Sequence, residues 1–103
     1  MEASFGVVYT FRILPEKANE FERAWRELTL LIREYEGGLG SRLHKVSDSE
    51  YFAYAQWPDK KTWESSGDNM PDSAQSHRDS MRASCTEIKT LIHGEIRSDE
   101  LLI

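Results

Sequence analysis

The chain has 103 residues, 39% of them hydrophobic, which suits one domain over residues 1–103 with a single core. A formal net charge of −5, with Lys and Arg nowhere gathered in a stripe, argues against nucleic acid or an anionic membrane surface as a partner. The lone cysteine, Cys85, excludes an internal disulfide, and the N-terminal segment lacks the basic and apolar regions of a signal peptide. No apolar run is long enough to span a bilayer. We therefore expect a soluble cytoplasmic protein.

Residues 5–14 alternate in the manner of a β-strand. One face carries Phe5, Val7, Tyr9, Phe11 and Ile13. The other face still includes Val8 and Leu14, which predicts that both sides of the sheet are at least partly covered.

The next segment is an amphipathic helix, with Pro15 in its first turn and Gly37 as its left-handed cap. Its apolar residues recur at steps of three and four. They are Ala18, Phe21, Ala24, Trp25, Leu28, Leu31, Ile32 and Tyr35. This stripe predicts a helix packed against the sheet.

A hairpin follows, with strands over residues 41–47 and 51–57 joined by a turn at Asp48 and Ser49. Pro58 cannot donate to a sheet ladder, so the second strand should end there. Asp59 is a helix N-cap candidate for a short helical turn over residues 60–64, which carries Trp63 back toward the domain.

The segment 65–73 contains Gly, Asn, Asp and Pro and is a break in the pattern. A second helix is predicted from Pro71 and Asp72 onward. Its apolar stripe comprises Ala74, His77, Met81, Cys85 and Ile88. Residues 90–96 close the domain as a final strand. The order strand, helix, strand, strand, helix, strand predicts a ferredoxin-like α+β fold with an antiparallel four-stranded sheet.

The segments PEKANEFERAW and QWPDKKTWES, a Gly-Gly loop between them and a histidine-bearing helix before the last strand resemble the antibiotic biosynthesis monooxygenase family. The resemblance extends over nearly the whole chain. It implies a dimeric α/β barrel, in which the sheets of two subunits pack face to face, and a pocket between each sheet and its helices. The family includes cofactor-independent oxygenases of phenolic substrates, haem-degrading enzymes and members with no known activity.

Three positions distinguish these activities in the family. Haem-degrading members use an asparagine on the first strand, a tryptophan on the helix after the third strand and a histidine on the following helix. In this chain the positions fall at Tyr9, near Ser66 and at His77. One match in three favours a cofactor-free oxygenase, which needs an apolar pocket, a base for a phenol and polar contacts to the resulting anion.

The catalytic candidates are His77 as general base and Tyr9 as hydrogen-bond donor to a substrate oxygen. Each has a structural alternative, because buried histidines commonly bond a backbone carbonyl and tyrosines commonly fill cores. Residues expected to contact the substrate are Phe11, Trp25, Trp57, Trp63 and Met81. For each of the two tryptophans near the strand-to-helix corner, packing in the core is the favoured explanation.

No metal or cofactor is expected. His44, His77 and His93 lack metal-ligand spacing, and no glycine-rich phosphate loop or flavin or nicotinamide fingerprint occurs. Two alternatives stay open: a haem-binding protein with His77 as the axial ligand, and a non-catalytic binder of small molecules. The two-faced first strand and the apolar tail Leu101, Leu102 and Ile103 predict a homodimer.

Overall fold

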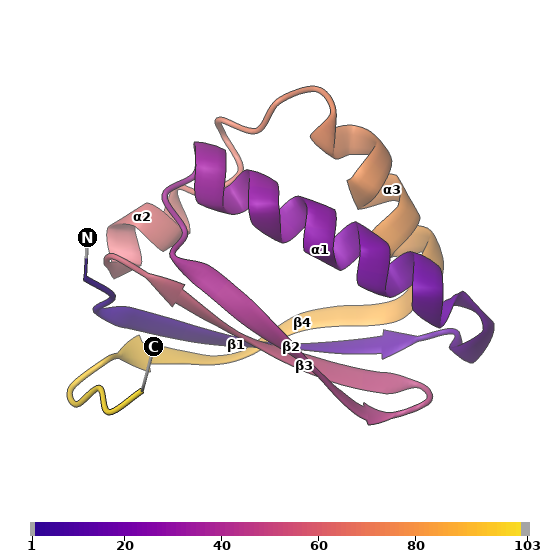
Figure 1. The fold of residues 1–103 in the computed structure, drawn as a ribbon, viewed down its shortest axis with the longest axis horizontal. Helices are drawn as coiled ribbons and strands as arrows, with labels where there is room; N and C mark the ends of the chain where they lie inside the picture. Colours follow the sequence, from indigo (N-terminus) through magenta and orange to yellow (C-terminus); the bar gives the residue numbers. More distant parts are fainter. Residues whose placement is uncertain (1, 102–103) are drawn as a thin grey trace.

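Four antiparallel strands form one sheet, with two long helices on one of its faces, in the computed structural model, which describes residues 2–101 (Figure 1). The strands are β1 (Phe5–Ile13), β2 (Gly40–Ser47), β3 (Glu50–Trp57) and β4 (Cys85–Glu95), in the spatial order β2-β3-β1-β4. The helices are α1 (Ala18–Tyr35), the short α2 (Lys60–Glu64) and α3 (Ala74–Ser84). This arrangement confirms the predicted ferredoxin-like α+β fold.

The central strand β1 alternates as its sequence predicts. Phe5, Val7, Phe11 and Ile13 are buried beneath the helices, and Tyr9 on the same face is half-buried. A fully buried Phe21 on α1 packs against Phe11 and Tyr51, with ring centroids 5.1 and 5.0 Å apart. Because aromatic rings bury large areas, this cluster fixes α1 to the middle of the sheet.

The predicted turns and caps are confirmed around α1 and α2. Pro15–Lys17 form a 3-10 turn, η1, directly before α1, and Gly37 has a φ of +80° just beyond the end of α1. Only glycine adopts that conformation without steric cost. At the start of α2 the Thr62 backbone N–H donates to Asp59 Oδ1 at 2.7 Å, so Asp59 is the N-cap.

The boundary between α3 and β4 differs from the prediction. Cys85 and Ile88, expected on the helix, belong to β4, where they pair with Ile13 and Phe11 of β1. Their spacing from Met81 fits a helical stripe, but the same residues can also pair along β1, and this tertiary pairing overrides the local pattern. The last strand therefore begins five residues earlier than predicted.

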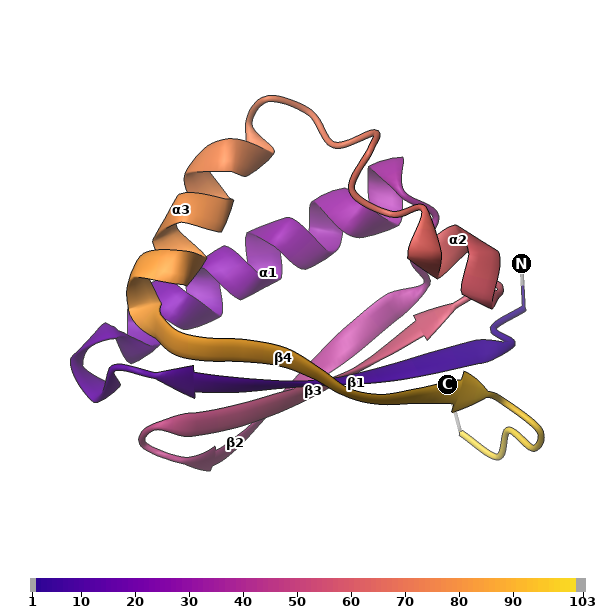
Figure 2. The ribbon, with the colours of Figure 1, turned by 180° about the vertical axis from the view of Figure 1, so that it is seen from behind.

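The face of the sheet opposite α1 and α3 carries no helix in either view (Figures 1 and 2). Half-buried Val8, Phe52 and Tyr54 lie on this open face, together with Ile92, which is 63% exposed. Of the predicted apolar tail, Leu102 and Ile103 lie outside the described residues, and Leu101 is exposed.

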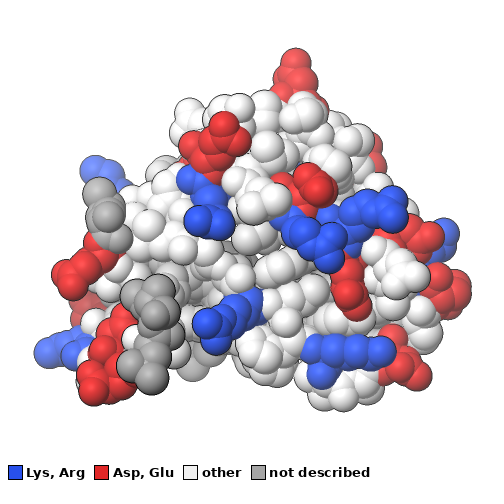
Figure 3. All heavy atoms as spheres, in the orientation of Figure 1, with Lys and Arg blue, Asp and Glu red and all other residues white. Residues whose placement is uncertain are grey.

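Charged side chains of both signs are mixed on the face shown in Figure 3. Among the helices of residues 2–101, none is long and apolar enough to cross a membrane.

Candidate functional site

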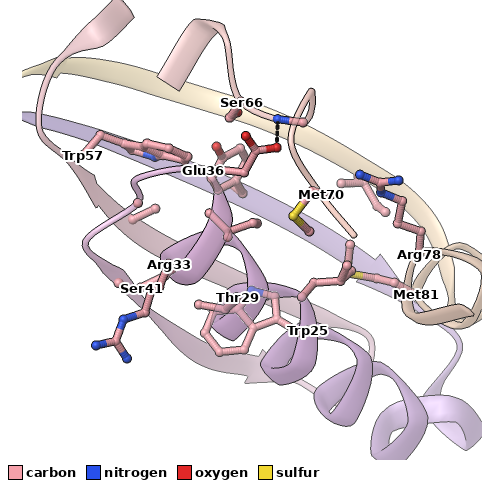
Figure 4. A pocket seen from close by; sticks show the side chains of 18 of the residues that line it. Trp25, Thr29, Arg33, Glu36, Ser41, Trp57, Ser66, Met70, Arg78 and Met81 are labelled. Carbon is pink, nitrogen blue, oxygen red and sulfur yellow. Dashed lines mark hydrogen bonds between the residues drawn. The ribbon is translucent and has the colours of Figure 1, made fainter. Parts of the chain in front are cut away.

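A cavity of about 520 Å³ lies between α1, the sheet, α3 and the segment 65–73 (Figure 4). Its wall is mostly apolar. The apolar side chains are Phe11, Trp25, Leu28, Ile32, Ala55, Trp57, Met70, Met81 and Ile88. Polar groups enter from Tyr9, Thr29, Glu36, Ser41, Gln56, Ser66 and three arginines. This volume and this mixture are typical of sites for small organic molecules.

Five of the seven residues predicted from the sequence line the cavity: Tyr9, Phe11, Trp25, Trp57 and Met81. The other two, His77 and Trp63, are not among its lining residues.

The α3 face toward the cavity is rotated from the predicted one. It presents Arg78, Met81 and Arg82, while His77 is half-buried beside them. The predicted stripe was drawn through Cys85 and Ile88, which are not helical. Met81 and Ile88 of that stripe line the cavity, whereas His77 is not among the lining residues.

Trp63 does not line the cavity but forms a hydrogen bond with Tyr9, which does. Its Nε1–H donates to the Tyr9 hydroxyl oxygen at 2.8 Å, and its ring packs against Phe5 and His93 at centroid distances of 5.5 and 4.8 Å. Because indole N–H is only a donor, the Tyr9 oxygen must accept, which leaves the Tyr9 hydroxyl hydrogen available to a ligand. Trp63 is therefore a positioning residue.

The Tyr9 hydroxyl remains protonated at neutral pH. Burial raises the pKa of Tyr9 above its usual value of 10.0, and the hydrogen bond from Trp63 offsets part of that rise. Tyr9 can therefore donate a hydrogen bond inside the cavity, and it is a poor choice for a general base.

Trp57 is only 3% exposed and carries a buried Nε1–H that has no hydrogen-bond partner among the described residues. Buried donors are nearly always paired, so an orphaned one in a cavity wall suggests that a ligand atom completes the bond. The sequence identified Trp57 as a pocket residue. It could not show that the N–H lacked a partner.

Glu36, which follows α1, is a functional candidate that the sequence analysis missed. Its side chain is buried, and its carboxylate accepts a hydrogen bond from the Gly67 N–H, dashed in Figure 4. It also accepts from the Asn69 N–H and the Asn69 Nδ2–H. The last two are 3.3 Å long. Glu36 thereby anchors the segment that closes one side of the cavity. An acidic residue at a helix C-terminus opposes the helix dipole, which is a signal the sequence did contain.

The described part of the chain contains no group of three or more His, Cys, Asp or Glu side chains that could hold a metal ion. The residues lining the cavity include no histidine or cysteine. His77, the axial ligand of the haem-binding alternative, is not among the lining residues.

The family model for antibiotic biosynthesis monooxygenases matches residues 4–70. No curated protein sequence matches the chain.

Solved structures share the fold at low sequence identity. SnoaB, a cofactor-independent oxygenase from Streptomyces nogalater, is 19% identical, with 98% of each chain covered and a TM-score of 0.68. A Caulobacter crescentus CB15 protein named for the same family is also 19% identical, covering 96% of this chain and 92% of that one, with a TM-score of 0.69. A Nitrosomonas europaea protein of unknown function is 9% identical, covering 98% and 96%, with a TM-score of 0.73.

Proposed function

Because the chain belongs to the antibiotic biosynthesis monooxygenase family, we propose that its cavity binds a small phenol- or quinone-like aromatic molecule and oxygenates it without a cofactor. The likeness in fold to SnoaB, itself a cofactor-independent oxygenase, supports this proposal. The apolar wall of the cavity suits a flat aromatic ring, and its volume of about 520 Å³ leaves room for more than one ring.

The observation that carries the proposal is the buried Trp57 N–H, which has no partner within residues 2–101. Together with the Tyr9 hydroxyl, whose hydrogen Trp63 leaves free, it gives two donors on side chains that line one apolar cavity. Such donors stabilise negative charge on a substrate oxygen far better inside a protein than in water. A phenolate held in this way is electron-rich enough to react with dioxygen.

The reaction balances without an external reductant. The substrate loses a phenolic proton and passes four electrons in all to dioxygen, as when a ring CH2 group becomes a C=O group. One oxygen atom enters the ring system, and the other leaves as water with two hydrogens from the substrate. The enzyme has only to remove a proton, hold the anion and exclude solvent.

Glu36 is the carboxylate that lines the cavity, and we assign it the role of proton acceptor in place of His77. A carboxylate has about four acceptor sites, and three donors occupy Glu36. One site is left for a substrate hydroxyl.

Oxygen uptake with a panel of hydroquinones and polycyclic phenols tests the proposal, in the presence of a chelator and without flavin, nicotinamide or haem. We expect uptake above autoxidation, reduced at least about tenfold in Tyr9→Phe and in Trp57→Phe, because each removes one donor and keeps an aromatic side chain at that position. Tyr35→Phe, which removes an exposed hydroxyl outside the cavity, is the matched control.

Uptake that needs an added cofactor, or that both donor variants retain in full, would contradict the proposal. A Soret band that forms with hemin and disappears in His77→Ala would favour the haem-binding alternative instead.

A further inference from the structure

The charged groups of the cavity wall are unevenly distributed. Glu36, the one carboxylate, is bonded to backbone and amide donors of the segment 65–73. Arg78 and Arg82 lie one turn apart on α3 and line the cavity on the side of Met81. In Figure 4 the Arg33 side chain points away from the cavity, while Arg78 lies beside Met70 and Met81. The α3 side of the cavity is therefore positively charged.

Neither Arg78 nor Arg82 forms an ion pair or a side-chain hydrogen bond with any described residue. The nearest acid in sequence, Asp79, accepts a hydrogen bond from Gln75 Nε2 at 2.8 Å instead. Arg78 is half-buried, so part of the solvent that would otherwise screen its charge is displaced. Both guanidinium groups are thus free to bind an anion.

Trp57 and Arg78 lie at opposite sides of the cavity (Figure 4). A ligand whose oxygen accepts from Trp57 at one end would therefore present its other end to α3. Guanidinium groups bind carboxylates through paired, charge-assisted hydrogen bonds.

We propose that the substrate is an aromatic acid, with its reacting oxygen near Trp57 and Tyr9 and a carboxylate at the far end, bound by Arg78 and assisted by Arg82. The inference rests on the proposed function only for the aromatic nature of the ligand. It specifies the substrate class: an anionic molecule, longer than a single ring, with an oxygen at one end and an acid at the other.

Equilibrium binding tests this inference without any turnover. Binding is monitored by the quenching of tryptophan fluorescence. The probes are a hydroxynaphthoic acid whose hydroxyl and carboxyl groups lie on opposite rings, and its methyl ester, which has nearly the same shape and no charge. We expect the wild type to bind the acid at least about tenfold more tightly than the ester, and added salt to reduce that preference.

Arg78→Gln should remove most of the preference, because it weakens binding of the acid far more than binding of the ester. Adding Arg82→Gln should remove the remainder. Arg78→Lys should keep part of the preference for the acid, because the positive charge remains but the paired donors of the guanidinium group are lost. Arg23→Gln, an exposed arginine of α1 outside the cavity wall, is the control with the same change of charge and should behave as wild type.

Equal affinity of the wild type for acid and ester overturns the inference, as does failure of the acid to bind, or an equal loss of preference in Arg23→Gln. The outcome is separate from that of the proposed function. Arginine-dependent binding of the acid without any oxygen uptake would support the inference and contradict the oxygenase. Oxygen uptake without preference for the acid would support the oxygenase and contradict the inference of an acidic substrate.

Discussion

At the scale of single residues, the cavity owes its chemistry to a few polar groups whose hydrogen bonds are incomplete. Within the described part of the chain, Tyr9 accepts from Trp63 and keeps its own hydrogen free, Trp57 has an N–H without a partner, and Glu36 has one unused acceptor site. In an apolar cavity such groups favour a ligand that completes their bonds, because leaving them unpaired costs free energy.

Glu36→Gln should lower the oxygenation rate by about 10²-fold or more if Glu36 accepts the substrate proton. Asn69→Ala removes one of the donors that hold the segment 65–73 but leaves the carboxylate in place. It should therefore reduce the rate much less. Oxygen-electrode rates of both variants separate the two roles of Glu36, and equal losses would leave it as an anchor only.

His77→Ala should keep its oxygenation rate within about threefold of wild type, because His77 does not line the cavity. A removed general base typically costs about 10²–10⁴ in rate. Oxygen-uptake rates of wild type and His77→Ala, measured on any active substrate, test this prediction. A loss of tenfold or more in folded protein would restore His77 as the base predicted from the sequence.

The Cys85 thiol should react slowly with alkylating agents in the folded protein. Burial raises the pKa of Cys85 to about 11, whereas an exposed cysteine has a pKa of about 8.5, and only the thiolate is nucleophilic. At pH 8 we expect alkylation by iodoacetamide to be roughly a hundredfold slower in the native state than in denaturant. Mass spectrometry over time measures both rates, and similar rates would show that the thiol is accessible and ionised.

At the scale of elements, α1 combines two tasks: it packs against the sheet and it forms one wall of the cavity. Phe21 is fully buried, whereas Trp25, one turn further on, is half-buried and lines the cavity. Sequence periodicity places both residues on the same apolar stripe and does not distinguish these roles.

Phe21→Ala should lower the free energy of unfolding by about 3–5 kcal/mol, as truncation of large core side chains usually does. Trp25→Ala should cost at least about 1 kcal/mol less, because part of its ring already faces the cavity and makes no packing contacts there. Urea unfolding of both variants measures the difference. Equal costs would mean that Trp25 belongs to the packed core.

At the scale of the whole molecule, the open face of the sheet is the feature that most needs a partner. Val8, Phe52 and Tyr54 lie there half-buried, and Ile92 is largely exposed. Apolar surface of this kind usually marks an interface, and sheets commonly pack face to face. This supports the homodimer expected from the family resemblance.

Light scattering at micromolar concentration should give about twice the chain mass of 11.9 kDa. Ile92→Asp should shift the protein toward the monomer, because it buries a charge at the proposed interface. Leu30→Asp changes an exposed apolar residue on α1 in the same way and should leave the mass unchanged. A monomeric wild type, or equal dissociation in both variants, would contradict the sheet-to-sheet dimer.

The aromatic lining of the cavity was expected from the family resemblance. Local sequence patterns correctly predicted the element order, the buried face of β1, the stripe of α1 and the caps at Gly37 and Asp59. These features depend on local periodicity and on the conformations that glycine, proline and aspartate favour, so neighbouring residues are enough to predict them.

Tertiary contacts alone determine where α3 ends and β4 begins, and which α3 residues face the cavity. They also determine that the Trp57 N–H is unpaired among the described residues and that Glu36 holds the segment 65–73 by hydrogen bonds. These features depend on groups that are distant in sequence. Cys85 and Ile88 pair with β1, and Glu36 accepts hydrogen bonds from residues more than thirty positions away. Local pattern carries no information about such pairings, because their energy arises only when the chain has folded.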